Sequence, residues 1–322
     1  MGIQLTDNEY YTGLSNLALY VAMYSTNKTD KSRSLIDAFT TESLEYGDTK
    51  IFRSVPFPTV GDYSSTSSLL GDHTPEFIPT GESAPVNGIE EVLRISSKKI
   101  IRNSYNTEML KMAIKSDYGM SDFLAIVMGN IEAAKVDYLY DMVVNDLYSL
   151  TPADTLTVTP VTPGEDAVPS EIQAAATLNL KSIELKIQYA IDKLTHFNTD
   201  CNKYGLKQAV NLSDLRLVVF QPYQNELVVD LMAELLRSPY ITESFAKPDM
   251  VTIPEYKATQ SSSYDNKLVA LVMHKAAYQL FYKLVIMGEF YDASTLRVNN
   301  FLHFWFGSGQ VEQLPCVAIK LD

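Results

Sequence analysis

Residues 61–88 read GDYSSTSSLLGDHTPEFIPTGESAPVNG, a stretch rich in residues that interrupt regular secondary structure. It holds four glycines, three prolines and eight serines or threonines, and no lysine or arginine occurs from Ser54 to Leu93. Glycine and proline both interrupt helices and strands. The stretch therefore predicts a long segment without regular secondary structure, and such a segment is usually either functional or disordered.

The quoted segment has few side chains that could order it. Ordering the backbone costs about 1–2 kcal/mol per residue, whereas burying one large apolar side chain returns about 1.5–3 kcal/mol. The segment is therefore either disordered or held by another molecule that supplies hydrogen bonds and apolar pockets. Adjacent apolar residues inside a polar arm favour the second alternative. The predicted contact residues are Tyr63, Leu69, Leu70, Phe77, Ile78 and Val86.

Strands are predicted on both sides of this segment. In residues 51–58, Ile51, Arg53, Val55 and Phe57 share one face, and the prolines end the strand. In residues 89–103, apolar and polar side chains alternate as in a half-exposed strand. The two strands would form the stems of a long hairpin.

The remaining chain mixes helices and strands. Apolar residues that recur every three or four positions predict the helices, the longest of which has Ser121 as its N-cap. LRLVVF, residues 215–220, is apolar throughout and predicts a buried strand. A proline-rich stretch, 151–171, predicts a subdomain boundary or a surface excursion. The predicted helices are 6–25, 31–45, 121–146, 172–197 and 224–237, and the further strands are 251–256, 267–273, 299–306 and 314–321, with a GSGQ turn at 307–310.

Composition excludes several classes of protein. The chain has 322 residues, 46% of them apolar, and a formal net charge of −13, so it is poorly suited to grip nucleic-acid phosphates. No stretch approaches 18 apolar residues, so no membrane span is predicted. Two cysteines, Cys201 and Cys316, are too few for a disulfide framework and predict buried, reduced thiols.

Residues that could carry catalysis or bind a metal or cofactor are not grouped in any known pattern. The chain lacks GxxxxGK[ST], HExxH and GxSxG motifs. His73 beside Asp72 lies in the quoted segment, where preorganised chemistry is difficult. His196 is predicted to end a helix, His303 to be a core residue on one face with Trp305, and Glu90 and Glu91 to point to opposite faces. We therefore assign no catalytic, cofactor-binding or metal-binding residue.

The order of these parts resembles the major capsid proteins of tailed bacteriophages, which have the Hong Kong 97-type fold. The similarity lies in EFIPTGESAP followed by IEEVLRISSKKIIRNSYNTEML, in the long helix from Ser121, in LRLVVFQPYQNELVVDLM, and in the closing FLHFWFGSGQVEQLPCVAIKL. The resemblance covers most of the chain from about residue 50. It implies a mixed α/β (α+β) fold with an N-terminal arm, an extended loop, a peripheral domain and an axial domain.

The resemblance also implies an organisation and a set of partners. The expected parts are an N-terminal arm (1–50), an extended-loop hairpin (51–105), a peripheral domain (106–155 with about 290–322) and an axial domain (156–289). Copies of the chain would form pentamers and hexamers of an icosahedral or prolate shell, assembled in the bacterial host cytoplasm, with the six predicted contact residues as an inter-subunit arm. A separate scaffolding protein and a portal protein are expected partners, and double-stranded DNA would be enclosed without sequence-specific binding. No cofactor and no membrane are expected.

Two other functions remain open at this point. An encapsulin-type bacterial compartment shares the fold but encloses an enzyme rather than DNA. A soluble enzyme whose long loop is an active-site lid would instead require a pocket with clustered titratable residues, which the sequence does not suggest.

Overall fold

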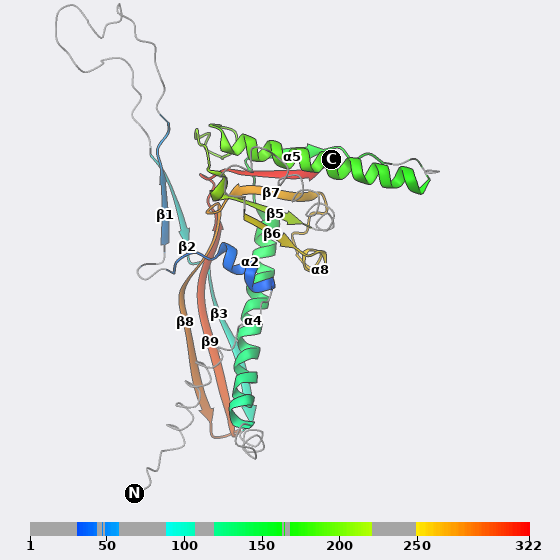
Figure 1. The fold of residues 1–322 in the computed structure, drawn as a ribbon. Coiled ribbons are helices and arrows are strands. Elements are labelled where there is room, and N and C mark those ends of the chain that lie inside the picture. The colour runs from blue at the N-terminus through cyan, green and yellow to red at the C-terminus, as the bar shows by residue number, and fades with distance from the viewer. Residues whose placement is uncertain are drawn as a thin grey trace, which may run out of the picture.

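The computed structural model describes residues 31–43, 47, 49–57, 88–106, 119–162, 164, 168–220 and 249–322. The helices expected over 6–25 and 224–237 lie outside the described residues, as do the six predicted contact residues and His73. The described strands form a two-stranded sheet, a three-stranded sheet and a five-stranded sheet. Figure 1 shows the three-stranded sheet and helix α4 running lengthwise, with helix α5 and the five-stranded sheet across one end.

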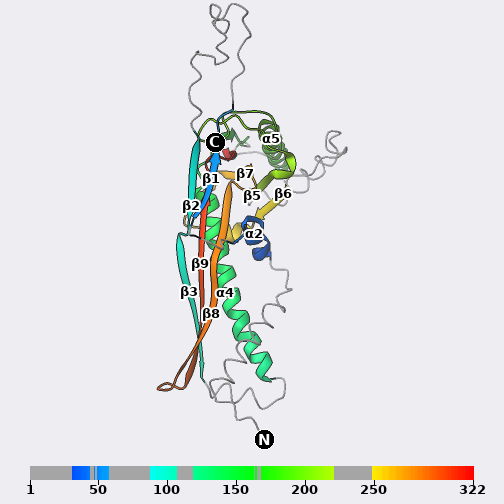
Figure 2. The same ribbon diagram turned by 90° about the vertical axis from the view of Figure 1, so that its left-hand side faces the viewer.

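The three-stranded sheet has the order β3-β9-β8 and is antiparallel throughout. Its strands are β3 (Ser97–Asn106), β9 (Arg297–Gln310) and β8 (Tyr278–Asp292), which are much longer than average. Helix α4 (Gly119–Ser149) follows one face of this sheet in both views of the molecule (Figures 1 and 2). Val298, Leu302, Phe304 and Phe306 alternate along β9 and are all buried in the core shared with α4.

The α4 helix is predicted correctly from its apolar periodicity, although it begins at Gly119 rather than after Ser121. Tyr138 packs edge-on against Phe304 and Phe306, with ring centroids 6.1 and 6.2 Å apart. The C-terminal end of α4 is tied to the sheet through Asp146, which accepts hydrogen bonds from Tyr278 (2.7 Å) and Ser308 (2.9 Å). Helix α4 and the three-stranded sheet therefore form one continuous structural unit.

The five-stranded sheet has the order β4-β10-β7-β5-β6. Its central strand β7 (Leu268–His274) pairs antiparallel with both β10 (Cys316–Leu321) and β5 (Leu215–Phe220). The outer strands β4 (Asp154–Val158) and β6 (Asp249–Ile253) pair parallel with β10 and β5. All six residues of β5 are buried, which confirms the strand predicted from the continuous apolar run.

The two faces of this sheet belong to different cores. Leu215, Leu217 and Val219 of β5 face helix α5 (Pro169–Thr195), whose Ile183 and Ile187 are fully buried. The alternate residues Val218 and Phe220 belong to the core that includes α4. The five-stranded sheet is thus covered by helices on both faces, which explains why its three central strands, β10, β7 and β5, are apolar with little alternation.

Charged groups attach helix α2 (Lys31–Phe39) both to α4 and to the five-stranded sheet. Arg33 forms an ion pair with Glu132 of α4 (3.0 Å). Arg216 of β5, only 5% exposed, forms an ion pair with Asp249 (2.7 Å), donates to the Ala38 carbonyl and lies over the Phe39 ring. A buried guanidinium requires such partners, and here they fix the end of α2.

The order of strands within the sheets does not follow their order along the chain. After β3, the chain returns to the three-stranded sheet at Tyr278 and leaves it at Gln310. The last strand, β10, belongs to the five-stranded sheet, as does β4 within the proline-rich stretch. Pairing between strands far apart in the chain leaves no local signal in the sequence, so this grouping of strands could not be predicted from it.

Three local predictions are also corrected by the structure. The GSGQ turn is wrong, because residues 307–310 continue strand β9. The predicted strand over 89–103 is two strands, β2 (Ile89–Arg94) and β3, because the chain changes pairing partner at Ile95 and Ser96. His303 shares a face with Trp305 as expected, but it is exposed rather than in the core.

The cysteines and the C-terminal end of α5 agree with the sequence, whereas the helix predicted over 31–45 already ends at Phe39. Cys201 and Cys316 are free and buried, and burial raises the thiol pKa of Cys201 to about 11 and that of Cys316 to about 12. His196 caps the C-terminus of α5, as expected. No helix in the described part of the chain is long and apolar enough to cross a membrane.

Candidate assembly interface

The two-stranded hairpin is the feature that the quoted segment connects. Strand β1 (Thr49–Ser54) pairs antiparallel with β2 in a register that places Ile51 opposite Val92 and Arg53 opposite Glu90. This pairing confirms the predicted hairpin stems. Because side chains alternate along both strands, the hairpin has one face toward the body and one face away from it.

The outward face of the hairpin is apolar at its centre. Ile51 is 49% exposed and its cross-strand partner Val92 is 38% exposed. Beyond the end of β1, Val55 and Phe57 are also exposed. Next to this apolar pair, Arg53 and Glu90 form a solvent-exposed ion pair at 2.9 Å. A directly opposed aliphatic pair bounded by charges is a composition suited to packing on another protein surface.

Two glycines let the hairpin cross the three-stranded sheet closely. A Cβ atom added at Gly307 of β9 would lie 2.7 Å from the Arg94 carbonyl oxygen and would overlap the Phe281 ring. A Cβ atom added at Gly309 would lie 2.8 Å from a methyl carbon of Leu93. The GSG sequence therefore serves close packing of β2 on β9, not a turn.

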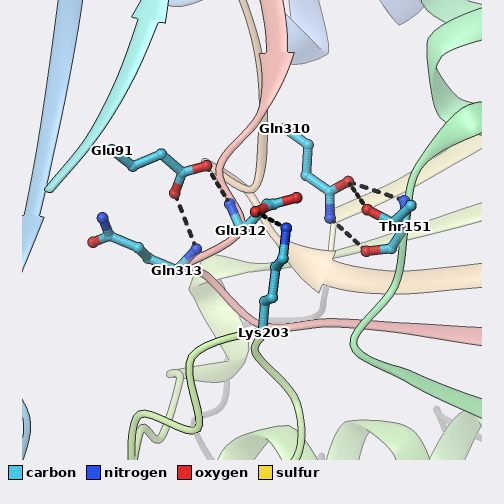
Figure 3. Close-up of polar contacts among 6 residues, drawn as sticks. All are labelled: Glu91, Thr151, Lys203, Gln310, Glu312 and Gln313. Atoms are coloured by element: carbon cyan, nitrogen blue, oxygen red, sulfur yellow. Dashed lines mark hydrogen bonds and ion pairs between the residues drawn. The ribbon is translucent and has the colours of Figure 1, made fainter. Parts of the chain in front are cut away.

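A carboxylate on the inward face anchors β2 to the loop that follows β9. The two oxygens of Glu91 accept hydrogen bonds from the backbone N–H groups of Glu312 (2.9 Å) and Gln313 (3.2 Å), as Figure 3 shows. Glu90, the neighbouring residue, points to the other face. The expectation that Glu90 and Glu91 cannot act as a carboxylate pair is therefore confirmed.

Gln313 connects both strands of the hairpin to the same loop. Its side chain is 1% exposed and accepts a hydrogen bond from Ser54. Its amide nitrogen lies 3.3 Å from the Phe52 carbonyl and 3.4 Å from the Ile89 carbonyl, and donates to both. A buried amide with all of these partners fixes the spacing of the two strands as well as their position.

Two further segments of the chain hold the end of β9 and the loop that follows it in place. Lys203, in the segment after α5, forms an ion pair with Glu312 at 2.5 Å, and its hydrogen bond to Glu312 raises the lysine pKa. Gln310 exchanges hydrogen bonds with the backbone of Thr151 in both directions, at 3.0 and 2.9 Å. Figure 3 shows these contacts side by side. The hairpin anchor thus joins β2, the end of β9 with the loop that follows it, and the segments before β4 and after α5.

A second, aromatic contact lies where β1 ends. Phe57 packs on Phe197 with ring centroids 5.4 Å apart, and the Lys207 ammonium lies 5.4 Å from the Phe57 ring centre. Both phenylalanines remain about half exposed or more, at 48% and 62%. The first residues beyond β1 are therefore directed along the segment that follows α5.

Replacing Glu91 by glutamine tests the carboxylate anchor. The amide NH₂ would face one of the two backbone N–H donors, and an unpaired, partly buried donor costs about 1–3 kcal/mol. We expect hydrogen exchange at the Glu312 and Gln313 amides to become roughly ten- to hundredfold faster, since about 1.4 kcal/mol corresponds to a factor of ten.

The matched control is Glu90→Gln on the opposite face. Its exposed ion pair with Arg53 contributes about 0–1 kcal/mol, so exchange at the two amides should change little. Equal exchange rates in Glu91→Gln and the unaltered chain would refute the anchor.

Sequence reasoning missed most of the residues that hold the hairpin on the body. Glu91, Gln313, Glu312 and Lys203 were not singled out as a group, because they come from three segments far apart in the chain. The glycines at 307 and 309 within an apolar strand were the available signal. Where the six predicted contact residues lie is not tested, since all of them fall outside the described residues.

Comparison with known proteins identifies relatives of this arrangement. The family model for Phi29-like phage major capsid protein matches residues 37–320. The capsid structure of Staphylococcus phage Andhra superposes with a TM-score of 0.59 at 9% identity, covering 88% of this chain and 83% of that one. The capsid structure of cyanophage P-SCSP1u superposes with a TM-score of 0.53 at 12% identity, covering 88% and 86%. No sequence among curated proteins matches significantly.

Proposed function

Because the chain belongs to the Phi29-like phage major capsid protein family, we propose that its hairpin and the loop it carries hold neighbouring subunits together in the capsid. The chain is a structural protein of the virion shell and has the Hong Kong 97-type fold, in agreement with the resemblance noted from the sequence. The family match favours a phage capsid over an encapsulin-type compartment.

The observation that carries this proposal is the exposed apolar face of an anchored hairpin. Ile51 and Val92 remain exposed although Glu91 and Gln313 fix the hairpin firmly on the body. An arm attached to its own subunit at a fixed hairpin meets the adjacent subunit at high effective concentration. Many weak contacts of this kind add up over a shell. Ordering of the segment 58–87 would then come from burial on the adjacent subunit.

The finer assignments follow the same proposal. The three-stranded sheet with α4 would be the peripheral domain, and the five-stranded sheet with α5 the axial domain around the five- and six-fold centres. A scaffolding protein would guide assembly in the host cytoplasm, and a portal protein would occupy one vertex. The net charge of −13 suits a shell that encloses DNA without adhering to it.

Electron microscopy of negatively stained particles tests the proposal. The full chain is purified alone and after co-expression with a phage scaffolding protein, and both samples are separated by sedimentation. We expect closed shells built of repeated capsomers in at least one sample. A chain that stays in oligomers of a few copies in both samples would contradict a shell-forming role.

A further inference from the structure

Two short connections join the five-stranded sheet to the three-stranded sheet. Residues 275–277 lead from β7 into β8, and residues 311–315 lead from β9 into β10. The two connections are hydrogen-bonded to each other, since the Val311 N–H donates to the Ala277 carbonyl at 2.7 Å. The turn after β7 therefore supports the loop that follows β9.

The supported loop, 311–315, is the one that holds the hairpin. The backbone N–H groups of Glu312 and Gln313 donate to the Glu91 carboxylate of β2, and the Gln313 side chain contacts both hairpin strands. A change in the turn 275–277 that displaces this loop would therefore also weaken the attachment of the hairpin to the body.

His274 holds the turn with three of its groups. Its backbone N–H donates to the Pro315 carbonyl at 3.1 Å, and its carbonyl accepts from the Ala277 N–H at 2.8 Å. Its imidazole Nδ1 lies 3.0 Å from the Ala276 nitrogen and accepts that N–H. An imidazole nitrogen accepts a hydrogen bond only while it carries no proton. The turn therefore requires a neutral His274 with its proton on Nε2.

An open cavity gives protons access to this imidazole. His274 is half-buried and lines a cavity of about 330 Å³. Asp214 is the only other titratable side chain among the described residues that line it, because those from 197–211 and from the 311–315 loop are uncharged. The neighbouring strand β5 places the apolar Leu215 opposite His274.

Burial and the charge of Asp214 act on the imidazole in opposite directions. Burial lowers the pKa of His274 below its ordinary value of 6.5, and the attraction of Asp214 raises it by less. Lys275, the next residue in the chain, is exposed, and Glu312 of the loop is paired with Lys203. His274 is therefore neutral at neutral pH and takes up a proton only in more acidic solution.

We propose that His274 is a pH-sensitive switch of the hairpin anchor. The neutral imidazole holds the turn 275–277 against the 311–315 loop. A protonated imidazole releases the Ala276 N–H, because two donors would then face each other. Release of the turn loosens the loop, so that Glu91 holds the hairpin less firmly in acid. This inference adds regulation to the proposed role of the hairpin between subunits, and rests on that role.

The direction of the pH effect follows from the difference in proton binding between the open and closed turn. The open turn leaves the imidazole of His274 in water with its ordinary pKa of 6.5, whereas the closed turn holds the pKa lower. The open form thus binds more protons. Closure is fully favoured above the ordinary pKa, and it is lost progressively as the pH falls toward the pKa of the closed form.

Hydrogen exchange in the unassembled full chain tests the switch, with each rate expressed relative to that of an unstructured chain at the same pH. We expect protection of the Ala276, Glu312 and Gln313 amides to fall roughly three- to tenfold between about pH 7.5 and about pH 5.5. His274→Asn should abolish this dependence. An asparagine oxygen can accept the N–H two residues later in the chain and does not titrate.

His303→Gln is the matched control, because it removes an exposed histidine of β9 and should leave the pH dependence unchanged. Constant protection in the unaltered chain, or a pH dependence that persists in His274→Asn, would overturn the inference.

A second measurement decides the case in which His274→Asn is poorly protected already at neutral pH. The imidazole of the unaltered chain is titrated by NMR. Protonation of His274 in step with the loss of amide protection supports the inference, and protonation at a different pH overturns it. These measurements need no assembled particle, so their failure leaves the shell function intact. Failure of the chain to form shells would contradict the role of the hairpin without changing these exchange rates.

Discussion

Deletion of residues 62–87 should leave a folded subunit that no longer forms closed shells. The remaining residues 55–61 and 88 are enough to connect Ser54 to Ile89, which already face each other across the hairpin. The anchor formed by Glu91 and Gln313 lies entirely outside the deletion. The subunit should therefore keep its thermal transition and its far-UV circular dichroism while it loses assembly.

A full-length control separates the chemistry of the arm from its length. In this variant the six predicted contact residues, Tyr63, Leu69, Leu70, Phe77, Ile78 and Val86, are all replaced by serine. The arm can still reach the neighbouring subunit, but it has lost the side chains that would bury there. We expect the same failure to close shells, and normal particles from either variant would show that the arm does not hold subunits together.

Gly307→Ala should destabilise the subunit strongly, because the added methyl group has no space. It would meet the Arg94 carbonyl oxygen at 2.7 Å and the ring of Phe281, which is fully buried. Backbone and core must shift to admit it, and such overpacking costs about 1–3 kcal/mol or more. The change should appear as a lower unfolding midpoint in denaturant with an unchanged slope.

Gly288→Ala is the matched control, because it lies in the partner strand β8 and a Cβ atom there has nothing within 4 Å. This substitution should alter the free energy of unfolding by no more than about 0.5 kcal/mol. A Gly307→Ala chain as stable as the Gly288→Ala chain would contradict the close crossing of β2 over β9.

Sequence reasoning located elements whose signal is local. The periodicity of α4, the continuous apolar run of β5 and the alternating stems of the hairpin all depend on residues close together in the chain, and each was predicted. The grouping of β10 with β4 and β7 depends on pairing between strands far apart in the chain, and this grouping was not predicted. Strand β8 was also missed, since after its first four buried residues polar and apolar side chains mix at half-buried and exposed positions.

For the side chains of the candidate interface, too, sequence reasoning could not detect contacts between residues far apart in the chain. Glu91 was noted only for pointing away from Glu90, because its partners are backbone amides more than two hundred residues later. Gly307 and Gly309 were assigned to a turn, since glycine pairs usually mark turns and the crossing strand is visible only in the folded chain. A buried side-chain amide such as Gln313 carries no sequence signature at all.

A cryo-electron microscopy reconstruction of the assembled particle tests the central claim most directly. The density following Phe57 and preceding Gly88 should run over an adjacent subunit, and the apolar pairs Leu69-Leu70 and Phe77-Ile78 should be buried between two copies. Density for this segment lying on its own subunit, in a particle that still forms a closed shell, would contradict the account.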